Sequence, residues 1–354
     1  MTSIKDRLND DVLRYIINFF DFYELFESIG LVDVKFHKLA LEVESNRLYQ
    51  KIKGIDHNNE NIYIVTTQRK FRLPIENRLN LKGPYNKLAN AMHYITDNGL
   101  ILIVQDGDYS IESSNYMADE ITKNIQIIGL PSKTFGIEIE MTKIQIIYRN
   151  VTFKNIIFYL PYSDPSYFVI HPYAHLKLYD CIFTDLTAPI GKFIDVHMAG
   201  YLTIYQCTFQ GPQTAIEIDN KACDIIIHSS RFQNMPLVEG NPDYIKYGCI
   251  ELSDMPREMR KCIMNTWKDD IKKLTSLKKP LMMHCTGNVF IDLEVDKRPF
   301  IESAYDKQTN DSQCVLYDNY SVGFSANMVH FIHPSDNPNF HFDTFYAGPY
   351  QPIY

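Results

Sequence analysis

The sequence is poor in several features that mark particular classes of protein. Only 15 glycines and 17 prolines occur in 354 residues, which excludes a collagen-like or low-complexity chain. The seven cysteines are dispersed, odd in number and free of any Cys-x-x-Cys pair, which indicates reduced thiols rather than a disulfide framework. No run of about 18 apolar residues occurs, so no membrane span is predicted. The apolar stretch 12–20 contains Arg14 and follows three aspartates, unlike a secretory signal.

What is present indicates an ordinary globular protein. The chain is 45% hydrophobic and 22% charged, which excludes wholesale disorder. Its net charge of −8 is opposite in sign to that expected of a protein that binds nucleic-acid phosphates, so nucleic acid is not an expected partner. With reduced cysteines and no export signal, we expect the protein in the cytoplasm or nucleus, not secreted and not in a membrane.

Residues 1–54 have the periodicity of short helices. Asn9 is a good N-cap, and Asp10 and Asp11 follow in the first turn, where carboxylates suit the helix dipole. Apolar residues then recur at helical spacing through Phe20, and two further helices are predicted before residue 54. Three short helices bury little apolar surface among themselves, so this block is expected to lean on a neighbour or a partner.

Residues 55–99 are predicted to hold a linker, a strand pair and a capping helix. The strands are expected at 63–66 and 69–73, and the helix at 86–96.

From residue 100 to 295 the pattern changes to short strands that recur at intervals of 20–30 residues, which is typical of a β-solenoid. Four segments align, at 146–153, 176–183, 202–209 and 225–232, and 284–290 resembles one more coil. Stacked as parallel strands, they would form a phenylalanine column and a small-residue column in the core. The first column is Phe153, Phe183, Phe209 and Phe232, and the second is Val151, Cys181, Cys207 and Ser230.

Two flanking segments depart from the repeat. Residues 254–279 interrupt it with a helical, basic composition that includes the only tryptophan, Trp267, and this insert is either a solvated helix face or a partner site. Residues 296–354 are expected to cap the C-terminal end of the solenoid, because an open coil exposes a strand edge.

The N-terminal pattern resembles the F-box. The resemblance rests on Leu8-Asn-Asp-Asp-Val-Leu13, then Phe20-Asp21, then Leu31-Val-Asp-Val-Lys-Phe36. Asn9 stands where the motif usually has proline, and Phe36 where it usually has tryptophan. The resemblance implies that an apolar face docks a Skp-type adaptor, which links the chain to a cullin-RING ubiquitin ligase. The implied adaptor-binding residues are Leu8, Leu13, Ile16, Phe20, Leu25, Leu31, Val32 and Phe36.

The repeat region resembles the right-handed parallel β-helix of pectin-lyase-like proteins. There an amphipathic helix precedes the first strand, as 88–109 suggests, and Asn124-Ile-Gln-Ile-Ile-Gly129 resembles the next coil. The resemblance implies the fold, a mainly β right-handed parallel β-helix behind a small helical module. It does not fix the chemistry, because such solenoids serve as enzymes and as binding surfaces.

A carbohydrate-active β-helix enzyme is the alternative function. Its candidate carboxylates are Asp180, Asp185, Asp195, Glu217, Asp219 and Asp224. Asp180, however, shares its place in the coil with Asn150, Gln206 and Ser229, which favours a role in a turn. A structural or assembly role for the solenoid is a third possibility.

No metal or other cofactor is predicted. The pairs His171/His175 and His330/His333 lack the further Cys or carboxylate that would complete a tetrahedral site. Cys181 and Cys207 have no neighbouring base in the pattern, so small apolar core residues are expected there. The two resemblances together imply a non-enzymatic adaptor whose β-helix recognises an unidentified substrate protein or glycan.

Overall fold

The computed structural model shows a mainly β protein. It describes residues 10–17, 38–39, 42–43, 46, 50, 61–67, 81–111, 118–130, 136–160, 167–184, 192–197, 199–211, 215–219, 223–233, 250–253, 282–291, 301–303, 313–322 and 340–347. The chain divides into two compact units, and each is taken by itself. The first comprises Met1–Ser113 and Ile125–Ile139, and the second comprises Ser114–Asn124 and Glu140–Tyr354.

The first unit combines two described helices with short strands. Its elements are α2 (Asp10–Ile17), β1 (Ile62–Val65), β2 (Leu81–Tyr85), α5 (Leu88–Tyr94), β3 (Gly99–Ile103), β4 (Gly107–Ser110), β6 (Ile125–Gly129) and β7 (Ile137–Glu140), which ends at the boundary of the unit. The predicted helix at 86–96 and strand at 63–66 are confirmed as α5 and β1. The strand predicted at 69–73 lies outside the described residues.

The parallel ladder starts earlier in the chain than expected. β1 pairs in parallel with both β2 and β3, and β3 pairs in parallel with β6, so parallel strands precede residue 100. Every residue of β1 and β3 is buried, and side chains from the paired strands pack into one apolar cluster. The cluster consists of Ile62, Ile64, Leu81, Leu100, Leu102 and Ile128.

The second unit holds the remaining strands. These are β5 (Ala118–Ile121), β8 (Ile144–Ile147), β9 (Asn150–Lys154), β10 (Ile157–Tyr159), β11 (Phe168–Ile170), β12 (His175–Tyr179), β13 (Ile182–Thr184), β14 (Ile194–Val196), β15 (Tyr201–Tyr205), β16 (Thr208–Gln210), β17 (Ile216–Asp219), β18 (Asp224–His228), β19 (Arg231–Gln233), β20 (Ile250–Ser253), β21 (Met282–Thr286), β22 (Val289–Ile291), β23 (Ile301–Ser303), β24 (Gln313–Val322) and β25 (Phe340–Ala347).

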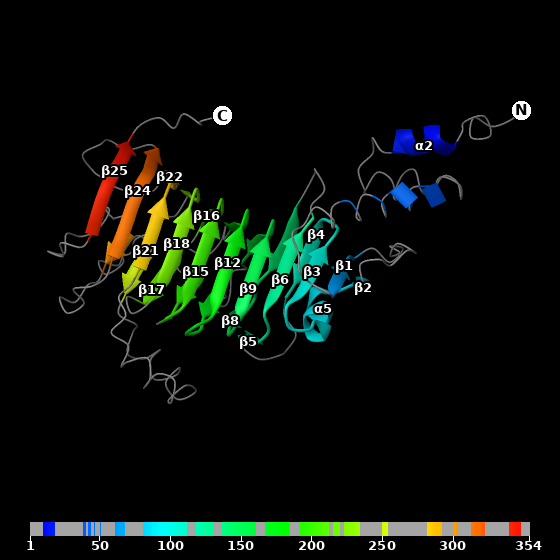
Figure 1. The fold of residues 1–354 in the computed structure, drawn as a ribbon, viewed down its shortest axis with the longest axis horizontal. Coiled ribbons are helices and arrows are strands. Elements are labelled where there is room, and N and C mark those ends of the chain that lie inside the picture. The colour runs from blue at the N-terminus through cyan, green and yellow to red at the C-terminus, as the bar shows by residue number, and fades with distance from the viewer. Residues whose placement is uncertain are drawn as a thin grey trace, which may run out of the picture. The chain divides into compact units, whose positions relative to one another are not determined.

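These strands form a parallel β-solenoid of about four turns, as the sequence predicts. The four regular turns each contribute three strands, from β8–β9–β10 to β17–β18–β19. Strands β9, β12, β15, β18 and β21 then lie side by side in parallel register (Figure 1). The coil predicted at 284–290 is confirmed as β21 and β22, and β24 and β25 continue the parallel pairing.

The predicted phenylalanine column is confirmed, but the prediction of Phe153 as its first member is wrong. Phe183, Phe209, Phe232 and Phe290 are register partners with stacked rings about 5 Å apart. The partner of Phe183 in the preceding coil is Phe158. Phe153 lies in β9 opposite Leu178, and Val151 lies opposite Leu176. The first repeat is therefore shifted by five residues, because two successive segments of this coil both end in x-Phe.

A column of left-handed residues turns the chain between neighbouring strands. Asp180, Gln206 and Ser229 have φ of 53°, 54° and 50°, and Asn155 and Gly287 also have positive φ. Asp180 is thus a turn residue, as predicted, although its counterpart in the first coil is Asn155 rather than Asn150. Short polar side chains and glycine tolerate this conformation best, which fits every member of the column except Gln206.

The small-residue column becomes polar in the later coils. Cys181 and Cys207 are buried as predicted, and burial raises the pKa of the Cys181 thiol. Ser230 Oγ then accepts a hydrogen bond from the Cys207 N–H, and Asn288 Oδ1 accepts one from the Ser230 N–H. Asn319 Oδ1 accepts from Asn288 in the same way. These side chains satisfy backbone groups in the core where the turns leave them unpaired.

Candidate functional site

Helix α2 carries two apolar stripes. Leu13 and Ile17, one turn apart, are buried, whereas Val12, Tyr15 and Ile16 are 44%, 67% and 40% exposed. Residues at i, i+3 and i+4 share one side of a helix, so the three exposed side chains form a single stripe. An exposed apolar stripe beside a buried one is a common mark of a helix that meets a partner.

Arg14 of α2 forms two ion pairs. It donates to Asp11 of the same helix and to Glu42, each at 3.0 Å. The first contact is exposed and the second is only partly buried, so their contribution to stability is small. Of the eight predicted adaptor-binding residues, the structure places Leu13 in the interior and Ile16 at the surface. Leu8, Phe20, Leu25, Leu31, Val32 and Phe36 lie outside the described residues.

The structure brings two of the six candidate carboxylates together. Asp195 of β14 and Glu217 of β17 are register partners on adjacent strands. Asp180 sits exposed at its turn, and Asp224 is exposed at the start of β18. Asp219 ends β17, and its side chain, like the whole of Asp185, lies outside the described part of the chain.

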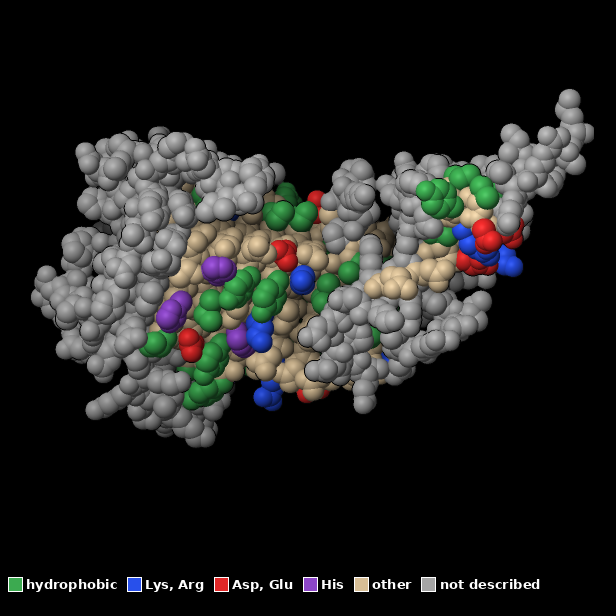
Figure 2. Space-filling view, turned by 45° about the horizontal axis from the view of Figure 1, so that its top comes forward, with side chains coloured by type: hydrophobic (Ala, Val, Ile, Leu, Met, Phe, Trp, Pro, Cys, Tyr) green, Lys and Arg blue, Asp and Glu red, His purple; other side chains and the backbone are tan. Residues whose placement is uncertain are grey.

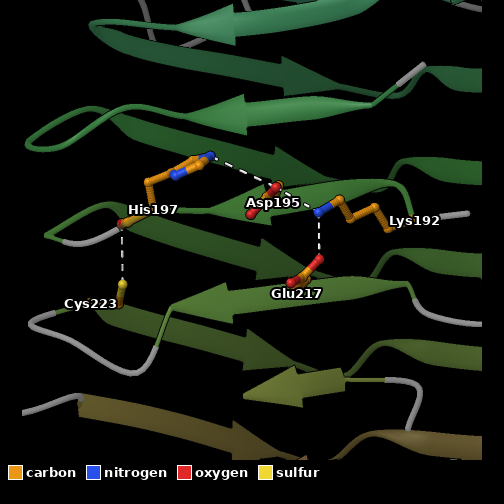
Figure 3. Close-up of polar contacts among 5 residues, drawn as sticks. All are labelled: Lys192, Asp195, His197, Glu217 and Cys223. Atoms are coloured by element: carbon orange, nitrogen blue, oxygen red, sulfur yellow. Dashed lines mark hydrogen bonds and ion pairs between the residues drawn. The ribbon is translucent and has the colours of Figure 1, made fainter. Parts of the chain in front are cut away.

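Lys192 joins the two carboxylates across neighbouring coils (Figure 3). Its Nζ lies 2.6 Å from Asp195 Oδ2 and also contacts Glu217 Oε2. The ammonium lies 4.9 Å from the ring centroid of Tyr167, and His197 Nε2 lies 3.7 Å from Asp195 Oδ2. Asp195 lies between the core residues Ile194 and Val196, so it is on the outer side of β14, yet its side chain is only 8% exposed.

The electrostatics of this cluster favour a closed ion-pair network. Burial alone lowers the pKa of the Lys192 ammonium, but Asp195 and Glu217 outweigh it and the net pKa is raised. Burial lowers the pKa of His197, against the attraction of Asp195, so this imidazole is neutral at pH 7. Burial also raises the pKa of Tyr167 to about 12. One lysine therefore balances part of the charge of two carboxylates that lie on different coils.

This arrangement fits cohesion between coils better than glycoside cleavage. Acid–base cleavage needs a carboxylic acid and a carboxylate that both reach a bound sugar. Here both carboxylates contact the same ammonium, and neither side chain is more than 17% exposed. Lys192, His197 and Tyr167 were not identified from the sequence, and the spacing Lys192-x-x-Asp195 was the available signal.

The histidines considered as metal ligands make other contacts. His171 Nδ1 is 3.1 Å from the Pro172 carbonyl, and His175 Nε2 is 2.8 Å from Thr203 Oγ1. Burial is the main cause that lowers the pKa of His175 to about 4. Among the residues that the structure describes, no group of three His, Cys, Asp or Glu side chains is arranged to hold a metal ion. His330 and His333 lie outside those residues.

A groove of about 640 Å³ lies where the chain turns after β5, β8 and β11. Because these strands are neighbours in one sheet, three successive turns line it. The Tyr148 and His171 rings face each other with centroids 4.6 Å apart, and Tyr173 is 58% exposed. The described lining residues are Thr122, Asn124, Tyr148, Arg149, Asn150, His171, Pro172 and Tyr173. The sequence signal was two aromatic-containing triplets, 148–150 and 171–173, but the strands that precede them, β8 and β11, were not predicted with these bounds.

The described surface carries exposed apolar side chains among charged ones. Figure 2 shows hydrophobic and histidine side chains over the middle of the described surface, with Lys, Arg, Asp and Glu side chains interspersed among them. Ile182, Tyr205 and Ile226 contribute exposed apolar surface, at 40%, 37% and 38% exposure.

No protein-family model matches the chain, and no curated protein matches its sequence. The fold nevertheless defines the class, a mainly β protein built on a parallel β-solenoid. Among the described elements, no helix is long and apolar enough to cross a membrane.

Proposed function

We propose that the chain is a non-catalytic substrate-recognition adaptor of a Skp–cullin–F-box type ubiquitin ligase. Its N-terminal helical segment docks the Skp-type adaptor, and its solenoid binds the substrate in the cytoplasm or nucleus. The observation that carries the proposal is the second apolar stripe of α2, formed by Val12, Tyr15 and Ile16. The sequence resemblance to the F-box supplies the identity of the partner.

The energetics of the stripe are adequate for part of such an interface. Fully burying a large apolar side chain contributes about 1.5–3 kcal/mol, and these three are half covered already, so they supply a few kcal/mol together. Association costs at least as much, so further apolar residues of the segment must take part. The predicted residues Phe20, Leu31 and Phe36 are the candidates.

The solenoid supports the binding role through rigidity. Parallel ladders fix each outward position, and function can then reside in the turns and outward faces of the coils. The buried lysine–carboxylate cluster fits the same interpretation, because it ties coils together and does not present an acid–base pair to solvent.

The test is co-purification of the full-length chain with a Skp-type adaptor. Ile16→Asp places a charge in the exposed stripe and should weaken binding more than tenfold. Ile226→Asp is the matched control, since Ile226 has nearly the same exposure but lies on the solenoid. Equal binding by both variants, or no complex with the unaltered chain, would overturn the proposal.

A further inference from the structure

Tyr173 is an unusual residue for the place it occupies in the turn after β11. Its φ is +66°, a left-handed conformation that strains a bulky residue and that asparagine or glycine adopts more easily. Core packing does not explain why a tyrosine occupies this position, because the Tyr173 side chain is 58% exposed. In the next coil the corresponding turn uses Ala199 at φ +61°, whose carbonyl accepts the Tyr173 N–H. Strain retained at an exposed aromatic indicates a function for the ring.

The ring of Tyr173 belongs to the groove described above. Tyr148 and His171 follow register partners Ile147 and Ile170, and Thr122 follows Ile121, which pairs with Ile147. The groove therefore runs along three successive coils. Two hydrogen bonds from backbone N–H groups hold its walls. The Tyr148 N–H donates to the Ile121 carbonyl, and the Asn150 N–H donates to Asn124 Oδ1. It is preformed rather than assembled by a ligand.

We infer that this groove binds a proline-rich segment of a protein partner in the polyproline II conformation. Grooves that recognise such segments are walled by aromatic rings, with polar groups that bond the peptide carbonyls. Tyr148 and Tyr173 are walls of this kind, and Asn124 and Asn150 place amide groups beside them. The inference rests on the proposed function, because it names the class of substrate segment that the solenoid would recognise.

The spacing of the groove fits this ligand. Parallel strands lie about 4.8 Å apart, so the first and third turns of the groove are about 9.6 Å apart along the stack. A polyproline II helix rises about 3.1 Å per residue and repeats every three residues, about 9.3 Å. A peptide that runs along the stack therefore presents the same face to every second coil.

Charge selects among such peptides. Arg149 is exposed and is the one charged side chain among the described residues that line the groove. An acidic residue beside the prolines would pair with its guanidinium, whereas a basic one would be repelled.

The experiment measures fluorescence anisotropy of labelled peptides with the full-length chain. The probes are decaproline flanked by aspartates, decaproline flanked by lysines, and an aspartate-flanked Gly-Ser repeat of equal length. The first should bind most tightly and the last at least tenfold more weakly. Arg149→Gln should remove the preference for aspartate over lysine flanks.

Tyr173→Asn separates a binding role from a structural one. Asparagine relieves the left-handed strain, so this variant should unfold at equal or higher temperature while peptide affinity falls at least fivefold. Tyr205→Ala is the control, because Tyr205 is also exposed on the solenoid but lies outside the groove. Equal losses in the two variants would overturn the inference.

Two further outcomes separate this inference from the proposed function. No peptide binding in a sample that still co-purifies with the adaptor would overturn only the groove assignment, as would tighter binding of an oligogalacturonide than of decaproline. Peptide binding without adaptor binding would overturn only the ligase proposal.

Discussion

Replacing Lys192 by methionine should destabilise the solenoid by about 3 kcal/mol at pH 7. The variant keeps the length of the side chain but leaves Asp195 and Glu217 buried on adjacent strands without the cation they share. Removing one partner from a buried ion pair costs about 3–5 kcal/mol. We take the lower end, because the three side chains retain 8–17% exposure and some solvent screening.

The loss should depend on pH in a defined direction. In the unaltered protein the raised pKa of Lys192 means that its contribution is complete below the ordinary value of 10.5. That contribution is lost as the pH rises through the folded-state pKa, so the difference in stability between the unaltered protein and the variant should shrink there.

Urea unfolding followed by far-ultraviolet circular dichroism measures both effects. Lys177→Met, on the outer side of β12, is the matched control and should change the free energy of unfolding by less than about 0.5 kcal/mol. The combination of Lys192→Met with Asp195→Asn and Glu217→Gln should recover most of the loss, because no buried charge remains. A loss below about 1 kcal/mol, or one that stays the same as the pH rises above 10.5, would refute the reasoning.

Three other substitutions test the core and the turns. Gln145→Met should raise the free energy of unfolding by about 1–2 kcal/mol, because the Gln145 Nε2 is buried without a hydrogen-bond partner; a loss in urea unfolding would contradict this. Phe209→Ala should cost about 3–5 kcal/mol, because it removes one ring from the stacked column, and a cost under 1 kcal/mol would show that the column is dispensable. Gln206→Gly should stabilise slightly or be neutral, because φ is +54°, whereas Gln206→Val should lower the melting temperature by several degrees; the reverse order would refute the left-handed turn.

The repeat could be predicted from the sequence because each coil of a solenoid repeats a similar pattern of strand and turn residues along the chain. Strand alternation and the recurring Phe identify which residues face inward, and this held for Phe183, Phe209 and Phe232. The error in the first coil arose because Phe153 and Phe158 both end an apolar-x-Phe segment. The turn residue would have resolved it, since Asn155-Ile-Ile-Phe158 matches Asp180-Cys-Ile-Phe183 at the left-handed position.

The cluster around Lys192 could not be predicted in the same way. Asp195 and Glu217 were candidates as single carboxylates, but their proximity depends on the register of β14 and β17, which are 22 residues apart. Lys192 precedes β14 and belongs to no repeated position. Its partner on the next coil therefore follows only from the stacked structure, as does the groove, whose lining comes from three turns of different sequence.

Tyr173 and the exposed apolar stripe of α2 each depart from a structural preference that the rest of the protein follows. The solenoid obeys its own rules at the phenylalanine column and at the left-handed turns filled by Asn155, Asp180 and Gly287. Tyr173 breaks the second of these rules, and the exposed stripe of α2 breaks the rule that apolar helix faces are covered. Real proteins tend to keep such violations where a partner compensates for them. Both violations expose aromatic or aliphatic surface, which is the kind of surface that a bound partner covers.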